Sequence, residues 1–370
     1  MTRRRLFVIV PRFRNESPVQ GVVALCNALA ESRPVTLVTL KSSARGPTVH
    51  PAVDRLDLTG ASGWHSKYRR YRSALTQCAR RPISLSIGFS GDLFNAFFRQ
   101  VADIWSSLRN NPYQDYSLSH GTAGRFAAAV HVRVLGTFHL VIAMSRFMES
   151  WLRSQGVLNT AIVGNFIDEE RTLQRAGGRH TPNDDSPLRL VFVGSLISRK
   201  RVDLALHGLS RLLTRGVSAQ LDVIGDGPLR AELQELCRTL GLQEAVRFRG
   251  YLQNPLEAVA RSDLLLLPSV SEGVSRAALE ALHLGVPVVL RRTEAAPELI
   301  DDGRTGVLFD DDAALPEALV RACELARMRR RVRRTCLIPD PFRQRQAIEC
   351  FLKLLETADS IAESNREHSS

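Results

Sequence analysis

The chain has 370 residues, of which 44% are hydrophobic and 24% are charged, and its formal net charge is +12 at pH 7. This length is sufficient for two domains, and the composition excludes a disordered chain. No apolar run approaches the roughly 20 residues that span a bilayer, no signal-peptide cleavage site follows the basic start, and the six scattered cysteines match neither a zinc site nor a disulfide framework.

Short apolar stretches alternate with longer amphipathic ones in the first half, which predicts a parallel sheet with crossover helices. Strands are predicted at 6–10, 35–40, 83–88, 103–108, 140–145 and 160–165, with helices such as 21–32 between them. Residues 175–187 then combine Gly, Pro, Asn and Asp with almost no apolar side chain, which predicts a linker. Beyond it the alternation restarts, with strands at 188–194, 219–225, 246–252, 263–269 and 287–290.

The pattern therefore predicts two α/β domains and a C-terminal helix. The domains are 1–174 and 188–340, separated by the linker, and a disordered tail is expected at 359–370. Apolar residues recur at helical spacing within 341–358, which predicts a helix with one buried stripe. Since ligands of such sheets bind outside the carboxyl ends of the strands, we expect a ligand in the cleft between the domains.

Two glycine-containing strand ends in the second half suit a phosphate group. Gly194 ends one strand, and Lys200 follows near the start of the next helix, where backbone N–H groups are free. Gly225 and Gly227 end the next strand. The third glycine of a dinucleotide-binding loop would fall at Arg230, so that interpretation is excluded.

The stretch SEGVSRAALEALHLGVPVV predicts a helix that starts near Ser275, with one carboxylate before it and one inside it. A diphosphate at that start would meet free N–H groups and the positive end of the helix dipole. Glu280 is then placed to bind ribose hydroxyls, and Glu272 to bind a sugar on the other side. The alternative, two unrelated surface acids, is disfavoured because Gly273 and the flanking strands stand in the expected order. The N–H groups at this start belong to Ser275, Arg276 and Ala277.

These stretches, in this order, resemble the nucleotide-binding half of the family 4 glycosyltransferases, which are retaining enzymes of the GT-B fold. The matching pieces are FVGSLISRKRVDLAL, LDVIGDGPLRAELQ, VRFRGYL, SDLLLLPSVSEGVSRAALEALHLGVPVV and PELIDDGRTGVLF, and the first half adds LVIAMSRFMESWL and VGNFIDEER. The resemblance implies an α/β architecture with two Rossmann-like α/β/α domains facing a cleft. It also implies that the C-terminal helix crosses back to the first domain.

The resemblance also implies roles for individual residues. Glu272 would contact the transferred sugar, Glu280 the ribose, and Lys200 the diphosphate. Ser195 stands where the family often has an arginine, so either Arg199 or Arg276 compensates or donor affinity is lower. The glycine that usually follows the lysine is Arg201 here. The full predicted donor-binding set is Gly194, Ser195, Arg199, Lys200, Gly225, Gly227, Gly273, Ser275, Arg276, Ala277 and Glu280.

The first domain offers two further candidates for the acceptor side. Arg109 ends a predicted strand and resembles part of a motif in some bacterial members, but pairing with a carboxylate at the strand end is equally compatible with its position. His120 lies at a predicted helix start, and a single histidine is more often structural. The loop from Pro11 to Gly21 lacks the double glycine common in relatives. The residues that contact the acceptor are therefore the ones that the resemblance assigns least well.

The family resemblance implies a metal-independent, retaining glycosyltransferase with no cofactor beyond its nucleotide-sugar co-substrate, most simply a UDP-sugar. Its acceptor would be a glycan or a lipid-linked glycan in bacterial cell-envelope polysaccharide synthesis, in the cytoplasm. One alternative is a GT-B nucleotide-sugar epimerase. Another is a basic nucleic-acid-binding protein, but the basic runs 67–81 and 327–334 lack the expected motifs and most of the interleaved aromatics, so we expect no nucleic acid.

Basic and aromatic residues of the first domain predict peripheral binding to the anionic inner face of the membrane. Several cations near an anionic leaflet, each contributing about 1 kcal/mol, would hold the protein reversibly, and aromatic rings suit the headgroup zone. The alternative is that these arginines keep the protein soluble or bind phosphate-rich soluble glycans. The residues concerned are Arg3, Arg4, Arg5, Arg12 and Arg14, and the run Lys67–Arg81 with Trp64, Tyr68 and Tyr71.

Overall fold

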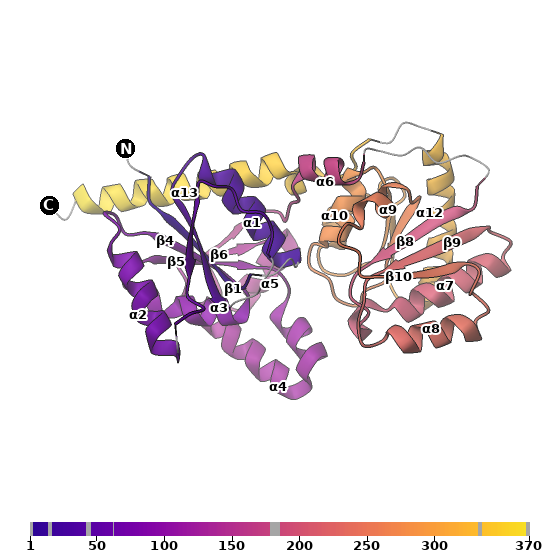
Figure 1. Cartoon of the computed structure of the whole chain (residues 1–370), viewed down its shortest axis with the longest axis horizontal. Coiled ribbons are helices and arrows are strands. Elements are labelled where there is room, and N and C mark those ends of the chain that lie inside the picture. The colour runs from indigo at the N-terminus through magenta and orange to yellow at the C-terminus, as the bar shows by residue number, and fades with distance from the viewer. Residues whose placement is uncertain are drawn as a thin grey trace. The chain divides into compact units, whose positions relative to one another are not determined.

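A computed structural model describes residues 3–13, 17–41, 46–61, 63–177, 186–331 and 335–367. The chain divides into two compact units (Figure 1). The first unit comprises Met1–Phe166 together with Arg343–Ser370, and the second comprises Ile167–Phe342.

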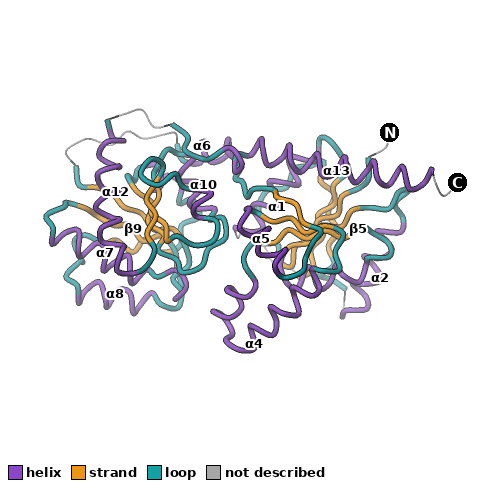
Figure 2. Tube along the Cα trace, turned by 180° about the vertical axis from the view of Figure 1, so that it is seen from behind, coloured by secondary structure: helices purple, strands orange, loops and turns teal. Residues whose placement is uncertain are grey.

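The first unit contains a seven-stranded parallel sheet in the order β3-β2-β1-β4-β5-β6-β7. Its strands are β1 (Leu6–Arg12), β2 (Val35–Lys41), β3 (Val53–Asp57), β4 (Ile83–Ile87), β5 (Asp103–Leu108), β6 (Leu140–Ala143) and β7 (Thr160–Ile162). Its helices are α1 (Ser17–Ala30), α2 (Gly63–Thr76), α3 (Gly88–Asn95), α4 (Pro112–Leu135), α5 (Arg146–Ser154) and α13 (Gln344–Glu367), with a 3-10 turn η1 (Ala96–Phe98). Figure 2 shows the strands lying between layers of helices.

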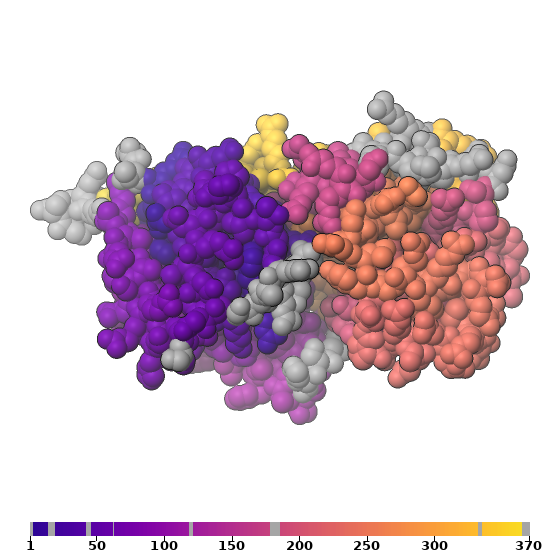
Figure 3. Space-filling model, viewed as in Figure 1, coloured from indigo at the N-terminus to yellow at the C-terminus, as the bar shows by residue number. Residues whose placement is uncertain are grey.

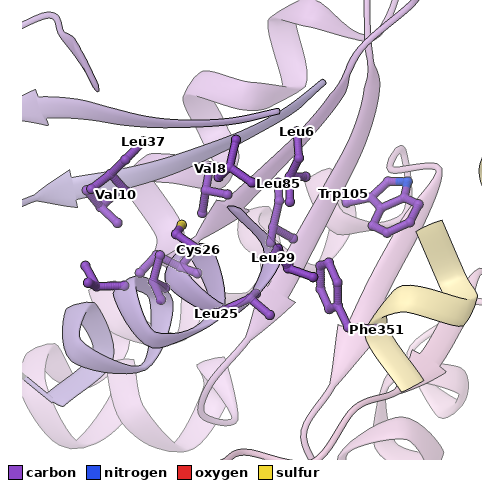
Figure 4. Close-up of a cluster of buried hydrophobic side chains, with 14 of the residues drawn as sticks. Leu6, Val8, Val10, Leu25, Cys26, Leu29, Leu37, Leu85, Trp105 and Phe351 are labelled. Carbon is purple, nitrogen blue, oxygen red and sulfur yellow. The ribbon is translucent and has the colours of Figure 1, made fainter. Parts of the chain in front are cut away.

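Both faces of this sheet are buried, and β1 shows why. Its side chains alternate between two apolar clusters: Leu6 and Val8 point to the face covered by α1 and α13, whereas Phe7 and Ile9 point to the face covered by α2 and α4. A strand buried on both faces reads as a continuous apolar run, which is why LFVIV was recognisable in the sequence. Figure 4 shows the first cluster, with side chains from α1 facing the strands.

Helix α13 belongs to the first unit, as the predicted fold required. Phe351 and Leu355 are buried in the same cluster as β1, and the Phe351 ring lies 6.2 Å from the Trp105 ring between centroids (Figure 4). Figure 3 shows part of the helix, in yellow, at the surface beside the indigo N-terminal residues. Three arginines bind the second half of the helix. Arg4 donates to the Ala358 carbonyl at 3.0 Å, Arg33 pairs with Asp359 at 3.2 Å, and Arg80 pairs with Glu363 at 2.7 Å.

These contacts correct two predicted boundaries. The helix was expected over 341–358, but it starts at Gln344 and continues to Glu367, so residues 359–367 are not a disordered tail. The apolar stripe fades near Leu355, and the continuation is supported by ion pairs of Asp359 and Glu363. The last part of the predicted tail, residues 368–370, lies outside the described residues.

The second unit contains a six-stranded parallel sheet in the order β10-β9-β8-β11-β12-β13. Its strands are β8 (Leu188–Val193), β9 (Ala219–Ile224), β10 (Val246–Gly250), β11 (Leu264–Leu267), β12 (Val288–Arg291) and β13 (Gly306–Phe309). Its helices are α6 (Glu169–Arg175), α7 (Val202–Thr214), α8 (Arg230–Thr239), α9 (Leu256–Ala260), α10 (Arg276–His283), α11 (Ala296–Leu299) and α12 (Leu315–Arg330). Its 3-10 turns are η2 (Ser198–Lys200), η3 (Asp312–Ala314) and η4 (Asp340–Phe342).

The boundary between the units lies at Phe166 rather than at residue 174, and the second unit reaches Phe342 rather than 340. Helix α6 packs within the second unit, where Arg175 Nη2 donates to the Gln253 carbonyl at 2.6 Å. Most of the predicted linker 175–187, namely 178–185, lies outside the described residues. The composition signal at 175–187 therefore marked a polar segment inside the second unit and not the boundary itself.

Two of the basic segments serve internal packing. Arg4 is 2% exposed, and Arg330 of the run 327–334 is 6% exposed. Arg330 binds Asp263 in a bidentate pair, with Nε–Oδ1 at 2.9 Å and Nη2–Oδ2 at 2.6 Å. Part of the high positive charge is thus neutralised inside the protein. Within the described ranges, no helix is both long enough and apolar enough to cross a membrane.

Candidate functional site

The loop after β8 passes very close to the end of β9, and this explains two of the predicted glycines. A Cβ on Gly225 would lie 1.8 Å from the Gly194 carbonyl oxygen, and one on Gly227 would lie 2.4 Å from that of Leu196. Gly225 also adopts a φ of +139°. Both glycines therefore shape the loop that contains Gly194 and Ser195, which gives them a structural role beside the predicted ligand contact.

The loop ends in η2, which presents two cations to one carboxylate. Lys200 Nζ lies 2.7 Å from both carboxylate oxygens of Glu272, and Arg199 Nη1 lies 3.0 Å from Glu272 Oε2. Arg199 also donates to the Ser271 carbonyl at 2.6 Å. The three charged side chains are only 12% to 20% exposed. The residues predicted to hold a sugar and a diphosphate are therefore in direct contact with each other.

Glu272 is followed at once by the start of α10, where the sequence predicted a helix. Ser275 is the N-cap, with extended φ and ψ of −64° and 123°, and its hydroxyl accepts from the Ala278 N–H at 3.5 Å. The helix runs from Arg276 to His283, so the first-turn N–H groups of Arg276 and Ala277 have no intrahelical partner. One turn later, Glu280 Oε1 accepts from Arg276 Nε at 2.9 Å.

A small cavity lies against Glu272, Gly273 and Ser275, and it involves residues that the sequence did not single out. Arg291 and Thr293, just where β12 ends, line its other side. Ser269 also lines it, and within the described part of the chain its buried hydroxyl has no hydrogen-bond partner. Ser269, Arg291 and Thr293 all lie at or just after the end of a buried strand. Strand ends meet at one edge of a parallel sheet, and this was the sequence signal that could have identified these residues.

Arg201, which replaces a usual glycine, adopts a left-handed conformation. Its φ and ψ are 49° and 47°, and among the described residues it is the only non-glycine with positive φ. Its guanidinium binds Asp203 Oδ2 at 3.0 Å and Asp312 Oδ2 at 2.8 Å. Hydrogen bonds from Arg291 and then Arg201 hold the pKa of Asp312 below its ordinary value. The strain of this conformation is thus accompanied by two ion pairs.

The two candidates of the first unit have different outcomes. Arg109, directly after β5, donates from Nη1 to Asn165 Oδ1 at 3.0 Å, and it approaches the backbone at Gly21. Asn165 belongs to the stretch VGNFIDEER, one of the pieces on which the family resemblance rests. His120 lies within α4, but its side chain is outside what the structure describes.

A polar chain that the sequence did not predict lies between α3 and α4 of the first unit. Tyr116 Oη lies 2.9 Å from His131 Nδ1, and His131 Nε2 lies 2.7 Å from Asp92 Oδ2. Asp92 Oδ1 accepts from Ser86 Oγ at 2.6 Å. Asp92 and His131 are almost fully buried, so the chain ties the end of β4 to both helices.

Comparison with known proteins relates the second unit to one family. Residues 187–325 match the model of the family described as glycosyl transferases group 1. The second unit belongs to this glycosyl transferase family. The match confirms the family 4 resemblance predicted from the sequence.

Relatives of this glycosyl transferase unit align over part of their length. N-acetyl-alpha-D-glucosaminyl L-malate synthase of Bacillus anthracis is 32% identical over 40% of this chain and 39% of its own length. The GDP-mannose-dependent alpha-(1-6)-phosphatidylinositol dimannoside mannosyltransferase of Mycobacterium tuberculosis is 30% identical over 55% of this chain and 53% of its own length. The aligned region thus spans between about two fifths and a half of these relatives.

Solved structures match nearly the whole chain and show its fold. Sucrose-phosphate synthase from Thermosynechococcus elongatus superimposes with a TM-score of 0.76 at 16% identity, over 97% of this chain and 100% of that one. The Anabaena protein HepE, in a complex with UDP and glucose, gives a TM-score of 0.70 at 14% identity, over 96% and 100%. The fold is therefore the predicted GT-B fold.

Proposed function

We propose that the protein is a glycosyltransferase that takes a sugar from a nucleotide-diphosphate-sugar bound in the second unit. The observation that carries this proposal is the contact of Glu272 with Lys200 and Arg199, directly before the N-terminus of α10. Two cations and a helix start attract a diphosphate, and the carboxylate beside them suits sugar hydroxyls. Ser195 provides no charge, and Arg199 is the second cation in its place.

The arrangement supports chemistry by electrostatic stabilisation of the leaving diphosphate. Lys200 and Arg199 would hold the phosphate oxygens as negative charge develops on them, together with the first-turn N–H groups of α10. A phosphate oxygen would accept the acceptor's proton on the same face, which gives retention of configuration. No metal or carboxylate nucleophile is required in this scheme.

A bound diphosphate would compete with Glu272 for the same N–H donors. Lys200 contacts both oxygens of Glu272 at 2.7 Å, so binding of phosphate partly replaces this ion pair. Glu272 would then be released toward the sugar. Removing its charge should consequently leave nucleotide affinity intact or increase it, while removing a contact to the transferred sugar.

The donor and the role of Glu272 are tested together. A thermal-shift panel of UDP-, GDP-, ADP- and TDP-sugars first identifies the base of the donor. We propose UDP. A GDP-sugar is included because one relative is named as GDP-mannose-dependent. For Glu272→Gln we expect release of nucleotide from the selected donor to fall at least tenfold, about the loss of one charge-assisted hydrogen bond. Nucleotide affinity should not fall. Glu232→Gln, an exposed acid on α8, is the control.

Two results would contradict this function. If Glu272→Gln lowered nucleotide affinity and turnover equally, the proposed contact of Glu272 with the sugar would be contradicted. If no nucleotide-sugar raised the melting temperature, the proposed donor site would be contradicted. Conversion of the donor sugar to its epimer without an acceptor would favour the alternative epimerase, and unchanged turnover in EDTA is expected for a metal-independent enzyme.

We further propose that the acceptor is a glycan or lipid-linked glycan and that the first unit docks on an anionic membrane. Three arginines of α2, Arg69, Arg70 and Arg72, are exposed. Next to this helix start, Trp64 and Phe97 are 45% and 60% exposed, with ring centroids 5.2 Å apart. Exposed rings beside arginines suit a headgroup surface.

This docking surface is smaller than the sequence predicted. Arg4 is buried, and Arg5 is paired with Asp54. Tyr71 is fully buried, and Tyr68 stacks on Phe98 at 5.1 Å between centroids. Arg14 lies outside the described residues.

Co-sedimentation with vesicles tests the docking surface. The full chain should bind vesicles containing phosphatidylserine, and binding should fall as salt is raised. Conversion of Arg69, Arg70 and Arg72 to Ser should reduce binding at least about tenfold, since each cation contributes about 1 kcal/mol. The same change at three exposed arginines of the second unit (Arg238, Arg247 and Arg261) is the control. Equal binding to neutral and anionic vesicles would contradict the proposal.

A further inference from the structure

His283, the last residue of α10, is held in one tautomer by the backbone. Its side chain is buried, and Nε2 lies 3.0 Å from the carbonyl oxygen of Glu169. A carbonyl oxygen only accepts hydrogen bonds, so Nε2 must carry the hydrogen. In the neutral ring, Nδ1 is then a lone-pair acceptor and a base.

That basic nitrogen faces a cysteine and a carboxylate. Cys336 Sγ lies 3.5 Å from Nδ1, and Glu169 Oε2 lies 3.8 Å from it. Cys336 is partly exposed. The Leu337 N–H donates to the Leu282 carbonyl at 2.8 Å and fixes this segment against the end of α10.

These three groups have the chemistry of a nucleophilic thiol. The S–H proton can pass to Nδ1, after which the imidazolium donates to the thiolate and is stabilised by the Glu169 carboxylate. We propose that Cys336 is an activated thiol that is modified by small electrophiles, with a peroxide as the natural class of reagent. The thiolate attacks one peroxide oxygen, an S–O bond forms, the O–O bond breaks, and the departing hydroxide takes the proton from His283 to become water. Sulfur is oxidised to the sulfenic acid, and the peroxide is reduced.

The other cysteines provide references within the same chain. Cys26 and Cys323 are buried, and burial raises the pKa of the Cys26 thiol to about 12 and that of Cys323 to about 11. Cys350 on α13 is partly exposed, like Cys336, but its sulfur accepts from the Gln346 side-chain amide at 3.6 Å, which is not a base. Cys350 is therefore the matched reference for exposure.

A timed reaction of the full chain with iodoacetamide at pH 7, followed by peptide mass spectrometry, measures each cysteine separately. Cys336 should react at least about tenfold faster than Cys350, because a histidine nitrogen lies beside the sulfur of Cys336 and can take its proton. In His283→Gln the rate at Cys336 should fall to within about twofold of Cys350. Cys26 and Cys323 report folding, since they react only if the protein opens.

Two further measurements complete the test. Hydrogen peroxide followed by dimedone should label Cys336 in the natural chain and much less in His283→Gln. If His283→Gln opens the protein, Glu169→Gln is the deciding variant, because it retains the backbone carbonyl and removes only the carboxylate charge. In this variant the rate of reaction at Cys336 should fall about threefold. Equal rates at Cys336 and Cys350 in the natural chain, or unchanged rates in the folded variants, would overturn the proposal.

Discussion

At the level of single residues, Arg201 stands where the family resemblance led us to expect a glycine. The left-handed conformation costs an ordinary side chain about 1–2 kcal/mol, and glycine avoids this cost. The arginine retains the conformation and adds ion pairs to Asp203 and Asp312. Both aspartates are partly exposed, so each pair contributes little on its own.

Two substitutions separate the strain from the ion pairs. Arg201→Ala loses the ion pairs and keeps the strain, whereas Arg201→Gly loses both. We therefore expect Arg201→Gly to be more stable than Arg201→Ala by about 1 kcal/mol. Urea unfolding of the two variants measures the difference. Equal stabilities would mean that the loop relaxes to another conformation in the alanine variant.

Residue identities in the site were predictable, but their contacts were not. The motifs located Lys200 and Glu272, since strand ends and the helix start are local signals. Lys200 was predicted to hold the diphosphate and Glu272 the sugar, yet the two form an ion pair at 2.7 Å across 72 positions of chain. Ser269 and Arg291 were missed because a single polar residue after an apolar run has no distinctive spacing.

At the scale of elements, α13 shows which boundaries the sequence could predict. Its buried stripe follows the 3.6-residue period, so the helix and its buried face were recognisable. Its true end depends on pairs such as Arg80–Glu363, which lie 283 positions apart and have no local pattern. Strand β3 was missed for a related reason: of its five residues only Val53 is buried.

Arg4, one of the arginines that hold α13, also binds Asp103, the first residue of β5, and this pairing makes stability depend on pH. Burial raises the pKa of Asp103, but the hydrogen bond and charge of Arg4 and the charge of Arg81 outweigh it, so the pKa lies below its ordinary value of 3.8. A depressed carboxyl pKa contributes stability above the ordinary pKa, and this contribution is lost as pH falls through the lower, folded-state value.

We therefore expect Asp103→Asn to reduce the dependence of stability on pH in the acid range. The natural chain should lose stability as pH falls below about 4, and part of this loss should be absent in the variant. Urea midpoints across that range provide the measurement. Asp54→Asn, which removes an exposed partner of Arg5, is the control. Identical pH profiles for the natural chain and Asp103→Asn would show that its charge is not used in folding.

At the scale of the whole molecule, the two predicted α/β halves are present, and the net charge of +12 has more than one origin. Arg4 and Arg330 are internal, and Lys200 and Arg199 belong to the candidate site, so the charge is not one continuous surface for a polyanion. Composition predicted an anionic partner without locating it. The motifs place the proposed phosphate contacts in the second unit, at Lys200 and Arg199.

The proposed function requires this site to bind the diphosphate of a nucleotide-sugar through Lys200. Calorimetric titration of UDP and GDP into the natural chain, Lys200→Ala and Lys353→Ala tests it directly. Loss of one charge-assisted hydrogen bond corresponds to about 1.5–3 kcal/mol, so Lys200→Ala should weaken the preferred nucleotide at least about tenfold. Lys353→Ala, at an exposed position on α13, should bind it like the natural chain. Equal affinities for the two alanine variants would place the phosphate elsewhere and contradict the proposed donor site.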